Sequence, residues 1–225
     1  MNDTETKNTA VKAPALMSTR PVTAQDALDQ CEKLSPMMVH YCQTKTGLTD
    51  PANTILFYRL GDFYEMFFED ATLVSKELEL TLTGKDCGME ERAPMCGIPY
   101  HAAEGYINRL VENGHKVAIC EQMEDPKQAK GMVKREVIRV VTPGTTLIPQ
   151  GLDETKNNYI MSIVCMEGCF GISTADISTG QCLVTEMDKP RRLVDEITKF
   201  MPAEIICNQS FLLCGIDVED LRTRL

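Results

Sequence analysis

An aromatic ring and a carboxylate stand two residues apart in the segment Phe63-Tyr64-Glu65. The preceding run from Ile55 to Leu60 is apolar and rich in β-forming residues, which predicts a strand, and Gly61 then predicts a bend. If extended backbone resumes, the period of two places Phe63 and Glu65 on one face. A ring that can stack and a carboxylate that can accept a hydrogen bond would then meet the same neighbour. The alternative is a strand end whose Phe belongs to the core and whose Glu is solvated.

Longer blocks in a fixed order make this segment more specific. The blocks are Phe57-Tyr58-Arg59-Leu60-Gly61-Asp62-Phe63-Tyr64-Glu65-Met66-Phe67, Pro94-Met95-Cys96-Gly97-Ile98-Pro99-Tyr100-His101, Val117-Ala118-Ile119-Cys120-Glu121-Gln122 and Val140-Val141-Thr142-Pro143-Gly144-Thr145. Together they resemble the N-terminal signature of the MutS family of DNA mismatch repair proteins, over a region from about Ser35 to the end of the chain.

The resemblance implies roles for individual residues. Phe63 would wedge beside a mispaired base, and Glu65 would hydrogen-bond to that base. Met95, beside Pro94, is an apolar candidate for the DNA groove, with a core position as its alternative. The implied function is recognition of mismatched or unpaired bases in duplex DNA during mismatch repair.

The resemblance also implies partners and missing parts. We expect mismatched duplex DNA, a homodimer of the full-length protein, and a MutL-type repair partner bound through the connector domain, in a bacterial cytoplasm and close to the nucleoid during repair. Family members are ATPases through a C-terminal domain with a P-loop, and no Gly-x-x-x-x-Gly-Lys-Ser/Thr string occurs here. We therefore expect an N-terminal fragment with no catalytic, ATP or metal site and no cofactor. ATP and Mg are expected only for the full-length protein.

The order of predicted elements indicates an α/β fold with two domains. Residues 1–30 lack large apolar side chains and are expected to form a disordered tail. Strands alternating with helices over 31–145 predict a mixed-sheet α/β mismatch-recognition domain, and turn residues over 146–157 predict a linker. Residues 158–225 predict three hairpin-linked strands, a helix and a strand, which resembles a truncated ribonuclease-H-like α/β connector domain.

Local signals place several boundaries. Ser35 and Pro36 predict the start of a helix, and Gly114 predicts the end of another. Residues 81–83 are predicted to form a short strand. The charged segment from Gly84 to Ala93 is predicted to be a loop.

Composition favours a soluble cytoplasmic protein. Of the 225 residues, 43% are hydrophobic, and no apolar run approaches the ~20 residues of a membrane helix. The N-terminus lacks the pattern of a signal peptide. None of the ten cysteines forms a Cys-x-x-Cys motif, so we expect reduced thiols. Those expected to lie in apolar settings are Cys31, Cys42, Cys96, Cys120, Cys182 and Cys207.

The net charge of −10 argues against a free-standing duplex binder. It favours either a domain that recognises a local feature of DNA while other parts of the protein contact the phosphates, or an alternative function as a non-catalytic protein-interaction module with weak DNA contact. The basic residues of the first domain that could reach phosphate are Lys85, Arg92, Lys127, Lys130, Lys134, Arg135 and Arg139.

A metal nuclease is a third alternative, because ribonuclease-H-like enzymes place a carboxylate on an early strand. Asp176 has that position, and Glu186 and Asp188 are the nearest candidates for the further carboxylates that a two-metal site needs. Capping of the turn at Ser178 explains Asp176 equally well.

Overall fold

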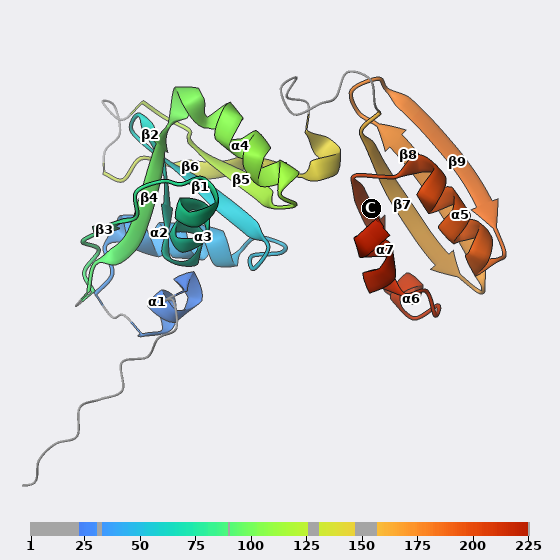
Figure 1. Ribbon diagram of the computed structural model, residues 1–225. Helices are drawn as coiled ribbons and strands as arrows, with labels where there is room; N and C mark the ends of the chain where they lie inside the picture. Colours follow the sequence, from blue (N-terminus) through green and yellow to red (C-terminus); the bar gives the residue numbers. More distant parts are fainter. Residues whose placement is uncertain (1–22, 31–32, 90, 126–130, 147–156, 225) are drawn as a thin grey trace, which may run out of the picture.

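Two sheets with separate hydrophobic cores make up the chain (Figure 1). The computed structural model describes residues 23–30, 33–89, 91–125, 131–146 and 157–224. Most of the expected tail, residues 1–22, and most of the expected linker, residues 147–156, lie outside the described residues, as do Cys31, Lys127 and Lys130. Within the described part, no helix has the length and apolar character needed to cross a membrane.

The first sheet has six strands in the order β3-β4-β2-β1-β5-β6. β1 and β5 are parallel and the other neighbouring pairs are antiparallel, which confirms the expected mixed-sheet α/β unit. The strands are β1 (Thr54–Leu60), β2 (Phe63–Phe67), β3 (Thr83–Lys85), β4 (Ala93–Pro99), β5 (Lys116–Gln122) and β6 (Arg135–Val141).

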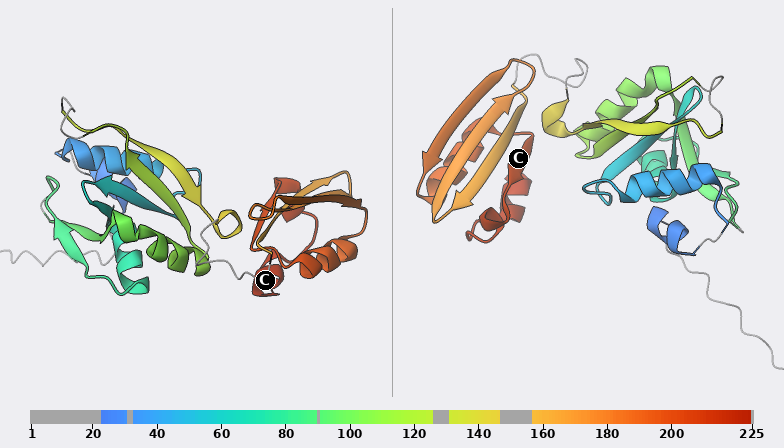
Figure 2. Two further views of the ribbon diagram at one scale, coloured as in Figure 1. Left: turned by 90° about the horizontal axis from the view of Figure 1, so that it is seen from above. Right: turned by 180° about the vertical axis from the view of Figure 1, so that it is seen from behind.

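Helices cover both faces of this sheet (Figure 2). The helices α3 and α4 pack on one face around Phe57, Met66 and Leu110, while α1 and α2 pack on the other around Tyr58 and Phe67. The helical segments are α1 (Ala24–Gln30), α2 (Pro36–Thr46), α3 (Phe68–Glu77), the 3₁₀ turn η1 (Tyr100–Ala102), α4 (Ala103–Glu112) and the 3₁₀ turn η2 (Pro143–Thr145).

Capping residues mark two of the predicted helix boundaries, the start of α2 and the end of α4. Ser35 Oγ accepts a hydrogen bond from Met38 N–H at 3.4 Å, and Pro36 occupies the first turn of α2. Gly114 has φ = +87° just after α4, where its N–H donates to the Val111 carbonyl at 2.9 Å. Both signals are confirmed.

The prediction of a disordered tail over residues 1–30 is wrong for its last residues, because residues 24–30 form the helix α1. Thr23 and Asp26 cap this helix reciprocally, each side chain accepting from the other's backbone N–H at 3.1 Å. Ala24 and Ala27 are buried, and Ala24 N–H donates to Glu69 Oε2 at 2.8 Å. Small side chains that bury little area gave no apolar signal in the sequence.

The short strand β3 lies two residues later than predicted, at Thr83–Lys85. It is an edge strand, and its register with β4 runs from Thr83 opposite Met95 to Lys85 opposite Ala93. Part of the expected loop from Gly84 is therefore strand. This shift places the Lys85 side chain beside β2.

The second sheet has four strands in the order β10-β7-β8-β9. β7, β8 and β9 are antiparallel neighbours, and β10 returns parallel to β7, as expected for the beginning of a ribonuclease-H-like unit. Its helices share one core with the sheet. The elements are β7 (Tyr159–Met166), β8 (Cys169–Asp176), β9 (Gln181–Met187), α5 (Pro190–Phe200), β10 (Glu204–Cys207), α6 (Gln209–Leu212) and α7 (Val218–Arg224).

The cysteine environments are only partly as predicted. Cys42, Cys96 and Cys120 are buried free thiols, but Cys182 and Cys207 are exposed. Cys182 belongs to the edge strand β9, which is open to solvent along nearly its whole length. Apolar neighbours in sequence therefore did not imply burial there.

Candidate nucleic-acid interface

The tight turn between β1 and β2 determines where Phe63 lies. Its first residue, Gly61, has φ = +58°, a region that favours glycine. Gly61 N–H donates to Gln122 Oε1 at 2.8 Å, and the Asp62 carbonyl accepts from Tyr100 N–H at 3.0 Å. Neighbouring segments therefore hold both residues of the turn, and β2 starts from a fixed point.

Phe63 is the first residue of β2, in register with Leu60 of β1 and Pro99 of β4. Its side chain is 46% exposed. Tyr64 and Met66 are buried in the core under α3 and α4, so Phe63 points to the opposite face of the sheet. The alternative in which Phe63 is a core residue is wrong, and its ring is open to a partner.

Glu65 lies on the same face as Phe63, as the period of two predicts, in register with Tyr58 and Gly97. Its Oε2 accepts a hydrogen bond from Lys85 Nζ at 2.6 Å, and the two side chains are 17% and 32% exposed. Glu65 is thus partly buried and ion-paired rather than fully solvated. No spacing in the sequence links it to Lys85.

Met95 lies in β4, in register with Phe67 on one side and Thr83 on the other. This register puts it on the same sheet face as Phe63 and Glu65. The side chain is partly buried against the cluster that contains Phe67. The three residues singled out in the sequence therefore share one face, with Met95 closest to the core.

Arg59 supports the turn from the other face. Its Nε donates to the Gly61 carbonyl at 2.5 Å, and its guanidinium lies 3.6 Å from the centre of the Tyr100 ring. Arg59 Nη1 and the Tyr64 hydroxyl both hydrogen-bond to the Glu121 carboxylate. Burial and then this carboxylate raise the pKa of Tyr64. The sequence offered no signal for this cluster.

A buried ion pair ties α2 to α3. Lys45 Nζ lies 2.6 Å from Asp70 Oδ1, and the side chains are 3% and 4% exposed. The other oxygen, Asp70 Oδ2, accepts from Leu56 N–H at 2.8 Å and from the Tyr41 hydroxyl at 3.4 Å. Tyr41 in turn accepts from Phe67 N–H at 3.2 Å. This network connects α2 and α3 to β1 and β2.

Several basic candidates are engaged within the protein. Arg135 is buried, donates to the Arg59 carbonyl at 2.7 Å and lies over the Tyr58 ring. Lys134 pairs with Glu136 at 2.7 Å on the surface. Arg92 and Arg139 are exposed. The described residues therefore offer few cations to phosphate near Phe63.

Asp176 caps a turn, as one of its two interpretations predicted. Its buried carboxylate accepts from Ser178 N–H at 2.9 Å, Ser178 Oγ at 2.6 Å, Thr179 N–H at 3.3 Å and Asn158 N–H at 3.2 Å. Burial raises the pKa of Asp176, but these hydrogen bonds outweigh it and leave the pKa below its ordinary value. Among the described residues, no group of three or more His, Cys, Asp or Glu side chains is placed to hold a metal.

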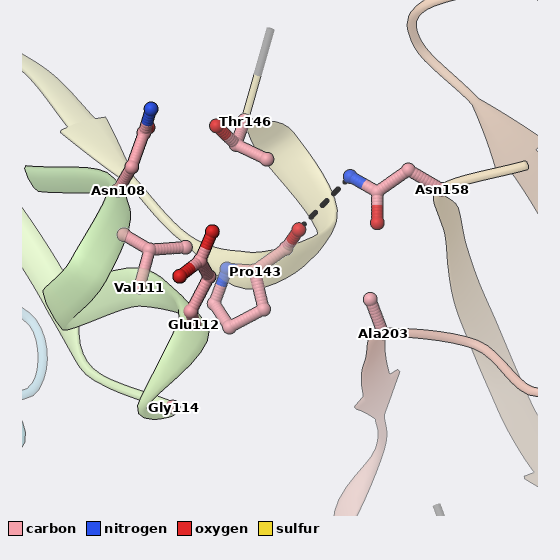
Figure 3. A pocket seen from close by; sticks show the side chains of 8 residues that line it. All are labelled: Asn108, Val111, Glu112, Gly114, Pro143, Thr146, Asn158 and Ala203. Atoms are coloured by element: carbon pink, nitrogen blue, oxygen red, sulfur yellow. Dashed lines mark hydrogen bonds between the residues drawn. The ribbon is translucent and has the colours of Figure 1, made fainter. Parts of the chain in front are cut away.

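A cavity of about 300 Å³ lies where α4 and η2 meet the second sheet (Figure 3). On its far wall, Asn158 Nδ2 donates to the Pro143 carbonyl at 2.9 Å. The buried Asn108 amide and Thr146 hydroxyl have no hydrogen-bond partner among the described residues. The cavity and the Phe63 side chain lie on opposite sides of the first sheet, because α4 packs on the face from which Phe63 points away.

Comparison with known proteins covers most of the chain. Residues 35–149 match the family model of MutS domain I, and residues 158–221 match that of MutS domain II. The chain is 65% identical over 192 residues to the DNA mismatch repair protein MutS of Lachnoclostridium phytofermentans, covering 85% of this chain and 20% of that protein. It is 56% identical over 181 residues to the protein of the same name from Acetivibrio thermocellus, covering 79% and 20%. The chain thus spans about a fifth of the length of these relatives.

Proposed function

We propose a function from one premise: the chain belongs to the MutS family of DNA mismatch repair proteins. Its six-stranded unit is proposed to recognise mispaired or unpaired bases in duplex DNA. Phe63 is proposed as the wedge and Glu65 as the acceptor for the displaced base. The observation that carries the proposal is an exposed ring at the start of β2 with a carboxylate on the same face. Met95 is proposed as a minor apolar contact.

The wedge distinguishes DNA steps by how easily they open. Opening a duplex step for an inserted side chain costs a few kcal/mol. Stacking a base on an aromatic ring returns about 1–3 kcal/mol. In paired DNA these terms nearly cancel, whereas a mispaired or unpaired step is already weakened and kinks more readily. Phe63 would therefore respond to deformability rather than to one base.

Glu65 would add a second filter. A carboxylate near phosphates is repelled, and this cost disfavours every complex that does not offset it. A base edge with a free N–H, such as thymine N3–H, offsets the cost through a hydrogen bond. A purine N7 has no proton, so that pairing requires a protonated carboxyl group.

The net charge of −10 implies that most phosphate contacts come from outside this chain. We propose that it acts as part of a longer protein that dimerises around DNA and carries its ATPase site elsewhere. The four-stranded unit is proposed as the connector through which a MutL-type partner binds. Catalysis is not assigned to this chain, and a bacterial cytoplasm near the nucleoid is the proposed location.

Replacement of Glu65 by glutamine tests the proposed filter. The change keeps the shape and removes the charge, so matched duplex should bind more tightly and discrimination should shrink, by roughly 2- to 5-fold for one part-exposed charge. The measurement is affinity for matched and mismatched duplexes at one fixed salt concentration in the full-length protein. Unchanged discrimination in Glu65→Gln would contradict the proposal.

The division into domains over 31–145 and 158–225 also stays a proposal. Each sheet has its own core, so limited proteolysis is expected to cut between 146 and 157 and to leave two resistant fragments. Mass spectrometry of the fragments identifies the cut. A single resistant fragment that spans this segment would indicate one fused unit.

A further inference from the structure

We propose that Lys85 is a specificity-determining residue: as the counter-ion of Glu65, it limits how strongly the site rejects matched DNA. The inference rests on the proposed function, since it assigns a regulator to the same carboxylate. Within the described part of the chain, Lys85 is the one cation that contacts a residue of the face formed by Phe63, Glu65 and Met95.

Lys85 makes two contacts with residues of β2. Its Nζ lies 2.6 Å from Glu65 Oε2 and 5.6 Å from the centre of the Phe67 ring. Both partners belong to β2 and point to the same face. The ammonium is thus held over β2 between a carboxylate and a ring, although Lys85 itself belongs to a different strand.

The ion pair leaves room for a base. Lys85 contacts Oε2 of the Glu65 carboxylate, and Oε1 remains as an acceptor. The strand opposite carries Gly97 in register with Glu65, and a Cβ added there would lie 3.5 Å from Glu65 Cγ. The absence of a side chain at this position keeps the approach to the carboxylate open.

The pair changes what approaching DNA meets. With Lys85 in place, the negative charge of Glu65 is partly compensated, so phosphates of a matched duplex are repelled less. Without Lys85, the carboxylate is uncompensated in the matched complex. In the mismatched complex, the base N–H still offsets part of its charge. Lys85 therefore weakens the rejection of matched DNA more than it assists the mismatched complex.

The edge position of β3 suits this role. β3 is a three-residue strand, and among the described strands β4 is its single neighbour in the sheet. Its short pairing lets Lys85 adjust when DNA enters, because edge segments open at low free-energy cost. Lys85 can then keep its ion pair with Glu65, or move toward a phosphate, without disturbing β2.

The test is a double-mutant cycle in the full-length protein. Lys85→Met, Glu65→Gln and the double variant are compared by affinity for matched and mismatched duplexes at fixed salt. Lys85→Met should weaken both complexes but raise discrimination about two- to fivefold, the range that a part-exposed ion pair supports. In the Glu65→Gln background, Lys85→Met should leave discrimination unchanged. Lys85→Arg retains the charge and should stay close to the parent protein.

A matched control removes a similar ion pair elsewhere. Lys116 pairs with Asp50 at 3.3 Å and lies opposite Thr54, at the far end of β1 from Phe63. Lys116→Met should leave discrimination unchanged. Thermal melting of every variant confirms that the folded protein is being compared.

Two results would overturn the inference. One is an equal loss for both duplexes, of the same size with and without Glu65→Gln, which would make Lys85 a phosphate contact only. The other is a fall in discrimination in Lys85→Met. If Glu65→Gln alone leaves discrimination unchanged, the proposed function itself fails, so the two failures are distinguishable.

Discussion

Replacement of Phe63 by alanine is expected to weaken binding of the full-length protein to mismatched duplex by about 5- to 150-fold. This range is the loss of roughly 1–3 kcal/mol of stacking on one base. Matched duplex should lose much less, because there the cost of opening the step nearly cancels the stacking. The preference for mismatches should therefore fall with the affinity.

Folding stability should change little in Phe63→Ala. The side chain is 46% exposed and points away from the core under α3 and α4, so its removal leaves no internal cavity. A buried Phe would instead cost about 3–5 kcal/mol on truncation. Thermal melting and binding, measured on the same preparation, separate the two effects.

Two further variants sharpen the result. Phe63→Leu keeps an apolar side chain but lacks an aromatic face, so it should fall between the parent and Phe63→Ala. Leu183→Ala truncates a side chain that is 42% exposed in the second sheet, and it should leave binding unchanged. An intact mismatch preference in Phe63→Ala would end the wedge hypothesis.

Local signals accounted for much of the fold. The apolar run from Ile55 to Leu60 predicted a strand, which the structure has as β1 (Thr54–Leu60), because strand alternation and turn residues act over a few positions. The same alternation predicted that Phe63 and Glu65 share a face, which the register confirms. These features depend on neighbours along the chain.

Features that depend on distant residues were not predictable. The ion pair between Lys85 and Glu65 requires β3 to lie beside β4 and β4 beside β2. The helix α1 depends on burial of Ala24 and Ala27 against α2 and α3 rather than on its own apolar pattern. Phe63 likewise remains exposed although Phe67, on the same face of β2, is buried under α1 and α2. A sequence pattern specifies the face of a strand, but tertiary packing decides whether that face is covered.

Removal of Lys45 is expected to cause a large loss of stability in the first domain. Lys45→Met leaves the Asp70 carboxylate buried without its counter-ion, and breaking a buried pair in this way typically costs about 3–5 kcal/mol. The exposed pair formed by Lys116 and Asp50 is the matched control, where Lys116→Met should cost about 0–1 kcal/mol. Urea unfolding at pH 7.5 measures both.

The loss should depend on pH in a defined direction. Burial raises the pKa of Asp70 from 3.8 to about 6 even though Lys45 opposes the shift. Because the folded pKa lies above the unfolded one, the stabilising contribution of the neutral carboxyl group is present below about pH 4 and is lost as the pH rises through about 6. Without Lys45 the folded pKa rises further. The deficit of Lys45→Met should therefore shrink toward pH 5, where Asp70 takes up a proton.

A second substitution separates the charge from the packing. Asp70→Asn in the Lys45→Met background removes the buried charge while an amide oxygen remains to accept from Leu56 N–H. The double variant should recover most of the stability and lose the pH dependence, because a pair removed together leaves no uncompensated ion. A double variant as unstable as Lys45→Met at every pH would show that the methylene packing of Lys45, not its charge, holds α2 on the sheet.

If the charge of Lys45 holds α2 in place, Lys45→Met should also weaken mismatch binding at pH 7.5. The reason is that Asp70 and Tyr41 together anchor Leu56 and Phe67, on the two strands that form the turn at Phe63.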